Sequence, residues 1–238
     1  MEILEAQWDK SNLGVRSHVI SINRILSADD ILEIKNLDSE YVIAKVEYVD
    51  LNRQLSDLGF TFAEKIESCV HNLATPKLAK IQARLLSKIS LKKVSKSERD
   101  DVIQNIDADM FVTDRIAMDP AFGPSIARNR YVNWITDITS NNGELYELIL
   151  GGDRVGFFCI QQINEKVTKG ILSGVYAKWR GKGFAIYLNY FQILLAQRKG
   201  SQFLETAYSS NNPQVRQVHE SLGFKISKIE EVYISHKS

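Results

Sequence analysis

A turn rich in glycine and positive charge is the stretch of this sequence best suited to bind an anion. It reads Arg180-Gly-Lys-Gly-Phe-Ala185, follows a strand-like segment over 170–177, and precedes apolar residues at helical spacing up to Lys199. A glycine turn that leads into a helix directs several backbone N–H groups to one spot, where the helix dipole adds positive charge. Arg180 and Lys182 would strengthen the attraction for a phosphate. An ordinary strand-to-helix turn is the alternative, because the Walker and dinucleotide glycine patterns are both missing.

Two motifs in this part of the chain resemble those of a known enzyme family. Arg180-x-x-Gly183-x-Ala185 resembles the acyl-coenzyme A pyrophosphate loop of the GNAT superfamily of N-acetyltransferases. Downstream, Asn212-x-x-Val215-x-x-Val218-His219-Glu220-x-Leu222-Gly223-Phe224 is similar to the second signature of that superfamily. The two motifs are independent and stand in the expected order and separation. The resemblance implies an acyltransferase that uses acetyl-coenzyme A as co-substrate.

The resemblance also implies which residues would hold the coenzyme. Backbone groups near Val175 and Ala177, on a strand that splays from its neighbour, would hold the pantetheine arm, and a nearby N–H would stabilise the oxyanion. Asn212 would contact the arm through its side-chain amide. Trp179 would cover the coenzyme entrance or be an exposed loop aromatic. The pyrophosphate would lie on the turn residues Arg180, Gly181, Lys182, Gly183, Phe184 and Ala185.

His219 stands where most relatives have a tyrosine whose hydroxyl protonates the departing thiolate. A histidine with an ordinary pKa of ~6.5 can do the same when cationic, and a neutral ring could still donate an N–H to sulfur. The alternative is a helix histidine packed against the sheet without a proton role. We favour the catalytic role, in a direct transfer from thioester to amine without an acyl-enzyme. No base is assigned, and Glu147 or a water chain is considered.

Looser resemblances, spread over the chain, connect it to the two-domain TDP-fucosamine acetyltransferase type. They lie in Trp8–Val15, in the ending Leu58-Gly59-Phe60, in the loop 111–119 and in Tyr131-x-x-Trp134-Ile135. That type acetylates the 4-amino group of a nucleotide-linked 4-amino-4,6-dideoxy sugar for surface polysaccharide biosynthesis. An arginine can clamp a pyrophosphate and an aromatic can stack on a base or sugar, although a surface ion pair or core packing is the alternative for each residue. The acceptor-side candidates are Arg115, Asp119, Arg128, Tyr131 and Trp134.

Two other functions remain open. A GNAT enzyme of this kind could act on a peptide or protein amine, a polyamine or an antibiotic, and an acidic acceptor groove would favour that. A non-catalytic acyl-coenzyme A module is the third hypothesis, against which Asn212 and the ionisable His219 argue.

Composition excludes several classes of partner. A net charge of +1 over 238 residues gives no general attraction for nucleic acid or an anionic membrane. No apolar run approaches the roughly 20 residues that span a bilayer, and the N-terminus is no secretory signal, so we expect a cytoplasmic protein. Cys69 and Cys159 lie far apart and are expected as buried free thiols. Four scattered histidines predict no metal site, and a homodimer is left open.

These elements predict an α/β (α+β) protein of two domains. Residues 1–88 would form a small N-terminal α/β domain, whose Leu58-Gly59-Phe60 either echoes Leu222-Gly223-Phe224 or matches it by coincidence. Residues 89–238 would form a GNAT fold with a mixed, mostly antiparallel sheet splayed at the acyl-coenzyme A site. Helices are expected from Ser27, over 51–58, from the capping box Ser95–Glu98 to about 107, over 125–138, from Ile186 and from Asn212, with a loop over 111–120. Strands are expected at 19–22, 41–49, 60–70, 90–94, 145–150, 155–163, 170–177, 202–208 and 225–234.

Overall fold

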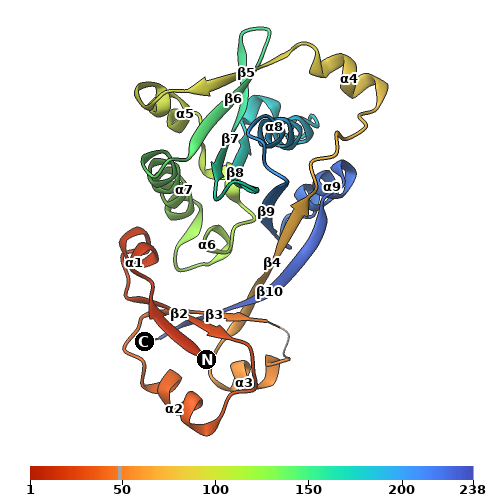
Figure 1. Ribbon diagram of the computed structural model, residues 1–238. Coiled ribbons are helices and arrows are strands. Elements are labelled where there is room, and N and C mark those ends of the chain that lie inside the picture. The colour runs from red at the N-terminus through yellow and green to blue at the C-terminus, as the bar shows by residue number, and fades with distance from the viewer. Residues whose placement is uncertain (48–49, 238) are drawn as a thin grey trace. The chain divides into compact units, whose positions relative to one another are not determined.

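The chain forms two compact units in a computed structural model that describes residues 1–47 and 50–237 (Figure 1). The first unit takes Met1–Glu67, Ser209–Asn211 and the C-terminal residues from Lys228. The second takes Ser68–Tyr208 and Asn212–Ser227. The predicted domains 1–88 and 89–238 differ from these units in their limits and stay a prediction.

The elements of the first unit are β1 (Glu2–Glu5), α1 (Gln7–Leu13), β2 (Ser17–Ile22), α2 (Ala28–Asn36), β3 (Tyr41–Val46) and α3 (Asn52–Asp57). Two long strands, β4 (Thr61–His71) and β10 (Lys225–His236), contribute residues to both units. The elements of the second unit are α4 (Lys80–Leu86), β5 (Ile89–Val94), η1 (Lys96–Glu98), α5 (Arg99–Gln104), η2 (Ala108–Phe111), α6 (Arg115–Met118), α7 (Gly123–Ser140), β6 (Glu144–Leu150), β7 (Asp153–Gln162), β8 (Val167–Val175), η3 (Ala177–Trp179), α8 (Ala185–Arg198), β9 (Phe203–Ser209) and α9 (Pro213–Leu222).

The first unit is a small mixed sheet with helices packed on it. β2 pairs antiparallel with β1 and parallel with β3, and β3 pairs antiparallel with β10. Helix α2 starts at a capping box in which the Ser27 hydroxyl accepts from the Asp30 N–H and the Asp30 carboxylate accepts from the Ser27 N–H. Buried apolar side chains of β2, β3, α2 and α3, among them Ile20, Ile34 and Leu55, form its core.

The second unit is a mostly antiparallel sheet covered on both faces. Its order runs β9-β8-β7-β6-β5, with only the β8–β9 pair parallel. Helices α5 and α7 lie on one face and α8 and α9 on the other (Figure 1). Phe157 and Cys159 of β7 enter the core on the α7 face, whereas Phe158 and Ile160 enter the core on the α8 face. A central strand buried on both sides explains the continuous apolar run in β7.

Most predicted elements are confirmed, with local differences. The predicted loop 111–120 is wrong in part, because Asp114 accepts from the Ile116 N–H and starts the short helix α6. The last predicted strand residue before the glycine turn, Ala177, lies in η3 rather than in β8. Strand β1 had no sequence prediction, and the predicted strand residues Tyr48 and Val49 lie outside the described residues.

The two cysteines and the glycines of the two Leu-Gly-Phe endings can also be compared with the sequence predictions. Cys69 and Cys159 are free and buried, as expected. Gly59 and Gly223 both close helices at positive φ, +78° and +93°, so the two Leu-Gly-Phe endings share a backbone conformation that favours glycine.

Among the described residues, no helix is both long and apolar enough to cross a membrane.

Candidate functional site

The strands β8 and β9 are joined by a ladder at one end only. Their parallel pairing covers Val167–Lys169 against Phe203–Glu205, whereas β8 stays paired with β7 as far as Val175. From Gly170 onward the edge of β8 therefore faces β9 without a shared ladder. We name this segment, residues 170–175, the β8 edge. The splay that the sequence predicts at this strand is confirmed.

Backbone hydrogen bonding fixes which groups the β8 edge presents. The Tyr176 N–H donates to the Val155 carbonyl at 3.0 Å, toward β7. Successive N–H groups of an extended strand point to opposite sides, so the Val175 N–H points away from β7, to the open side. Ala177 instead starts the 3₁₀ turn. Val175 therefore presents a backbone donor to the open side of β8, and its expected contact with a pantetheine arm remains a prediction.

The glycine turn 181–184 joins this edge to helix α8. Gly181 and Gly183 adopt φ of +73° and +79°, and a Cβ added at either would meet nothing within 4 Å. The turn needs glycine for its conformation, and its backbone is open to a ligand. Helix α8 begins at Ala185 with no side-chain cap and no acidic residue in its first turn. Its first N–H groups thus remain available for an anion, apart from that of Tyr187, which donates to the Phe184 carbonyl at 3.0 Å.

The cations of this turn have partners within the second unit. Arg180 pairs with Asp107, and the Lys178 ammonium lies 2.6 Å from Asp153. Lys182 donates to the Lys178 carbonyl at 2.7 Å. Both lysines approach the ring of Trp179, at 5.3 and 5.4 Å from its centroid.

Trp179 itself is half-buried and meets Phe184 edge to face at 4.9 Å. It therefore belongs to the wall of the turn and is not an exposed loop aromatic.

Asn212 acts as the N-cap of α9. Its side-chain oxygen accepts from the Val215 N–H at 3.2 Å, which satisfies one of the free donors of the first turn. Its side-chain nitrogen makes no hydrogen bond with the described part of the chain and can take a second partner. The expected amide contact with a pantetheine arm remains a prediction.

His219 is buried, 4% exposed, between the rings of Tyr208 and Phe224. Its Nδ1 lies 2.8 Å from the Val215 carbonyl, which can only accept, so Nδ1 carries the hydrogen. Nε2 has no hydrogen-bond partner among the described residues and presents a lone pair when the ring is neutral. Burial lowers the pKa of His219. A neutral ring therefore cannot donate an N–H to sulfur, which corrects that part of the sequence interpretation.

A buried polar network lies beside the end of β8, on the α7 face. The Tyr176 hydroxyl donates to Glu147 at 2.6 Å, and Glu147 has no exposed surface. Arg154 approaches the other carboxylate oxygen at 3.5 Å. Burial, and then the nearby Glu147 charge, raise the pKa of Tyr176 well above its usual value. Glu147 is thus enclosed by its partners, and no acceptor amine can reach it as a base in this arrangement.

The acceptor-side candidates are held by contacts around α6 and α7. Asp119 is buried and accepts from the Ala121 N–H at 3.0 Å, and Arg128 donates to the Ile106 carbonyl at 2.6 Å. Tyr131 donates to Asp114 at 2.7 Å, and burial raises the pKa of its hydroxyl. Arg115 and Trp134 are half-buried on the same elements. The structure therefore gathers the five candidates in one region, where each has contacts within the fold.

The short helix η2 connects this region to the β8 edge. A Cβ added at Gly174 would lie 2.5 Å from the Met110 sulfur, so Met110 packs directly on that glycine. Phe111 stacks on Tyr131 with ring centroids 3.6 Å apart. Asp107, the N-cap of η2, accepts from the Asp109 N–H and also pairs with Arg180. These contacts could not be predicted from the sequence, because each depends on which side chain of its type the fold brings near.

No group of three or more histidine, cysteine, aspartate or glutamate residues in the described ranges could hold a metal ion.

Comparison with known proteins identifies the fold. No family model matches this sequence, and neither does any curated protein. A functionally unknown conserved protein from Staphylococcus epidermidis aligns over 94% of this chain and 85% of its own length, with a TM-score of 0.61 and 12% identity. A GCN5-related N-acetyltransferase from Sphaerobacter thermophilus aligns over 82% of this chain and 59% of its own, with a TM-score of 0.57 and 13% identity.

A third structure is the GCN5-related glucosamine N-acetyltransferase region of a fungal multi-domain GH3 beta-N-acetylglucosaminidase. It aligns over 81% of this chain and 25% of its own, with a TM-score of 0.59 and 12% identity. At such identities the likeness concerns the fold alone. The chain has the fold of the GCN5-related N-acetyltransferases.

Proposed function

We propose that this protein is an acetyl-coenzyme A-dependent N-acetyltransferase. The observation that carries the proposal is the β8 edge, which runs directly into an uncapped, glycine-rich helix N-terminus. Extended backbone donors suit the amides of a pantetheine arm, and the helix N-terminus suits its pyrophosphate. The residues present therefore fit an acyl-coenzyme A as co-substrate.

In this proposal each part of the site has a separate task. The N–H groups of the turn 181–184 and the Arg180 side chain bind the pyrophosphate, and Val175 orients the arm. A backbone N–H of the β8 edge polarises the thioester carbonyl, where negative charge develops in the transition state. The Asn212 amide nitrogen is the side-chain donor to the arm.

His219 is the proposed proton carrier near the sulfur. Because its N–H is directed at Val215, only the bare Nε2 can exchange a proton with a ligand. An acid role therefore needs the cationic ring, which burial disfavours. If His219 is the acid, kcat falls as pH rises above the lowered pKa of the histidine. The variant His219→Gln should then lose this falling part of the pH dependence of kcat. If kcat only rises with pH in both the wild type and His219→Gln, as expected when the acceptor amine deprotonates, the acid role of His219 is excluded.

For the acceptor we propose an amino sugar, with a nucleotide-linked 4-amino-4,6-dideoxy sugar as the specific candidate. The fungal glucosamine N-acetyltransferase region shares this fold, and the acceptor-side set contains arginines and aromatics suited to a nucleotide diphosphate. The five residues of this set would contact the acceptor or orient the elements that do.

A second candidate acceptor is a cationic amine such as a polyamine or a lysine side chain. Residues 107–119 contain four aspartates and one arginine, and Asp109 is exposed, so this segment is acidic. An acidic surface would attract such a substrate.

Thiol release from acetyl-coenzyme A separates these candidates. The panel contains TDP- and UDP-linked 4-amino-4,6-dideoxy sugars, glucosamine, spermidine and a lysine peptide. Turnover on the nucleotide sugars alone supports a nucleotide-linked amino sugar as the acceptor. Turnover on the polyamine or the peptide supports a cationic amine instead. Coenzyme binding without turnover on any amine contradicts the enzyme proposal and favours an acyl-coenzyme A-binding module.

A further inference from the structure

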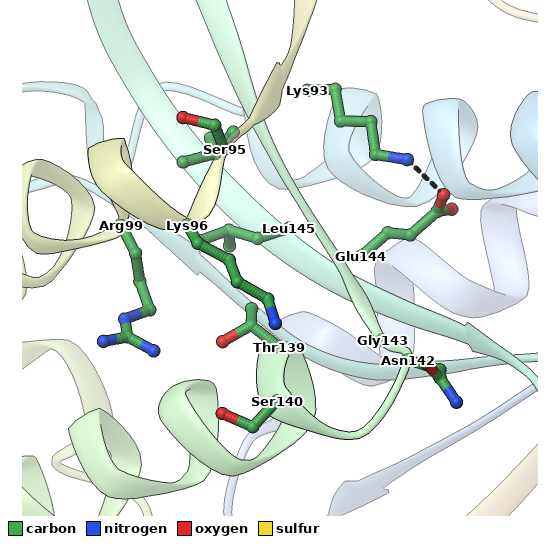
Figure 2. Close-up of a pocket in the computed structure, with 11 residues that line it drawn as sticks. Lys93, Ser95, Lys96, Arg99, Thr139, Ser140, Asn142, Gly143, Glu144 and Leu145 are labelled. Atoms are coloured by element: carbon green, nitrogen blue, oxygen red, sulfur yellow. Dashed lines mark hydrogen bonds and ion pairs between the residues drawn. The ribbon is translucent and has the colours of Figure 1, made fainter.

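A cavity of about 380 Å³ lies in the second unit, away from the β8 edge. It opens between η1 and the start of α5 on one side and the end of α7 and the start of β6 on the other (Figure 2). None of its lining residues belongs to β8, the glycine turn or α9. Its volume is within the range of small-molecule pockets.

The charges around this cavity do not cancel. Lys93, Lys96 and Arg99 line it, with Glu144 as the only lining carboxylate. Glu144 already pairs with Lys93, and with Lys199 at 2.5 Å. Figure 2 shows the Lys93 ammonium turned to Glu144, away from the two other cations. The cavity thus has two cations that its own carboxylate does not neutralise.

Lys96 and Arg99 are available to a ligand. Among the described residues Lys96 has no ion-pair partner and is exposed, and Arg99 has only the exposed Asp100, 3.7 Å from its Nε. That Nε is buried and makes no hydrogen bond. In Figure 2 both side chains reach toward the end of α7, where Thr139 and Ser140 lie. Two cations on one side of a cavity suit a single anionic group.

The opposite wall offers two hydroxyl acceptors, beside the side-chain amide of Asn142. The Thr139 hydroxyl donates to the Ile135 carbonyl and the Ser140 hydroxyl to the Thr136 carbonyl, both at 2.8 Å. A hydroxyl has one hydrogen, so each presents lone pairs to the cavity. The chain reverses here because Asn142 takes φ of +62° and the Gly143 N–H closes on the Ile138 carbonyl at 2.9 Å. This wall therefore suits a ligand that donates hydrogen bonds.

We propose that this cavity binds a small hydroxylated anion, with its phosphate group on Lys96 and Arg99 and its hydroxyls donating to Thr139 and Ser140. A sugar phosphate has this chemistry. Inorganic phosphate would satisfy only the cationic wall and glucose only the accepting wall. The site is independent of the proposed acetyl transfer, because the two share no residue.

Glucose 6-phosphate, inorganic phosphate and glucose serve as probes in calorimetric titrations of the full chain. We expect glucose 6-phosphate to bind more tightly than phosphate, and glucose not to bind. Arg99→Gln should weaken binding about tenfold, and Lys96→Gln should do so by a smaller factor. Amide NMR shifts should appear at 96–99 and 139–143.

Two control variants keep the test sharp. Lys77→Gln changes an exposed lysine outside the cavity, and Arg180→Gln changes the arginine of the glycine turn, the other site for a phosphate. Both should bind glucose 6-phosphate as the wild type does. Loss of binding in Arg180→Gln with retention in Arg99→Gln would overturn the proposal, as would no binding of any probe.

Discussion

The α7 face and the β8 edge of the second unit use their polar groups in opposite ways. On the α7 face, Tyr131 is bonded to Asp114, Tyr176 to Glu147 and Arg128 to a backbone carbonyl. Along the β8 edge and the turn, the donors are backbone N–H groups, with an uncapped helix start at Ala185. In α9, the Nε2 of His219 has no hydrogen-bond partner among the described residues. The named side chains of the first region bond to groups within the fold, whereas the second region leaves backbone N–H groups for a ligand.

On the α7 face the identity of the side chains decides the chemistry, whereas along the β8 edge the backbone conformation decides it. A satisfied buried network stabilises a particular arrangement of elements, so its loss should appear first as lost stability. An unsatisfied edge is available for binding, so a change there should appear first as lost affinity. Substitutions in the two regions should therefore differ in whether stability or ligand affinity is lost first.

The largest effect is expected at Glu147. Glu147→Ala leaves the Tyr176 hydroxyl and Arg154 without their buried partner, and the free energy of unfolding should fall by about 3–5 kcal/mol. Glu144→Ala is the matched control on the same strand, because its carboxylate is partly exposed and should contribute only about 1 kcal/mol. Urea denaturation measures both. Equal losses of unfolding free energy in the two variants would show that the buried pairing of Glu147 stabilises the fold no more than the partly exposed pairing of Glu144 does.

Gly183→Val should abolish coenzyme binding with less effect on stability. A β-branched residue is strained at φ of +79° and alters the turn that directs its N–H groups. We expect acetyl-coenzyme A to bind about a hundredfold more weakly, or ~2.7 kcal/mol. Gly200→Val is the control, since Gly200 has φ of +77° and similar open space at the other end of α8. Equal coenzyme affinity in the two variants would contradict the assignment of the turn.

His219 should make stability depend on pH. Burial lowers its folded pKa below the unfolded value of about 6.5, so the unfolded state binds more protons below that pH. Its contribution is therefore complete above pH ~6.5 and declines as pH falls, with a slope of at most ~1.4 kcal/mol per pH unit. His219→Gln should lose this part of the slope in urea titrations, while the part from His71, whose pKa burial also lowers, remains. An unchanged slope would contradict the buried neutral ring.

The smallest effect is expected at the ion pair between the two regions. Asp107→Asn frees Arg180 for a ligand phosphate, so acetyl-coenzyme A should bind about threefold more tightly, by ~0.7 kcal/mol. Asp153→Asn removes the exposed partner of Lys178 and should change affinity less. Weaker binding in Asp107→Asn would show that the ion pair orients Arg180 instead of competing for it.

The two regions also differ in how far the sequence predicts them. Gly183, the apolar spacing of α8 and the start of a helix at Asn212 are local signals, because a turn, a helix face and a helix start involve neighbouring residues. The pairs Arg180–Asp107, Tyr176–Glu147 and Tyr131–Asp114 join positions 73, 29 and 17 residues apart. Residue type suggested Tyr131 as an acceptor contact, but the fold decides that its hydroxyl bonds to Asp114. The splay of β8 was predicted from a resemblance and not from spacing.

Amide hydrogen exchange at Val175, measured with and without acetyl-coenzyme A, is the most direct test of coenzyme binding along the β8 edge. The Val175 N–H faces the open side of β8, whereas the Tyr176 N–H is bonded to Val155. A bound pantetheine arm should slow exchange at Val175 and at the turn 181–184, and change Tyr176 little. Coenzyme binding that leaves exchange at Val175 and the turn unchanged, or no binding at all, would contradict the proposal that the coenzyme lies along the β8 edge.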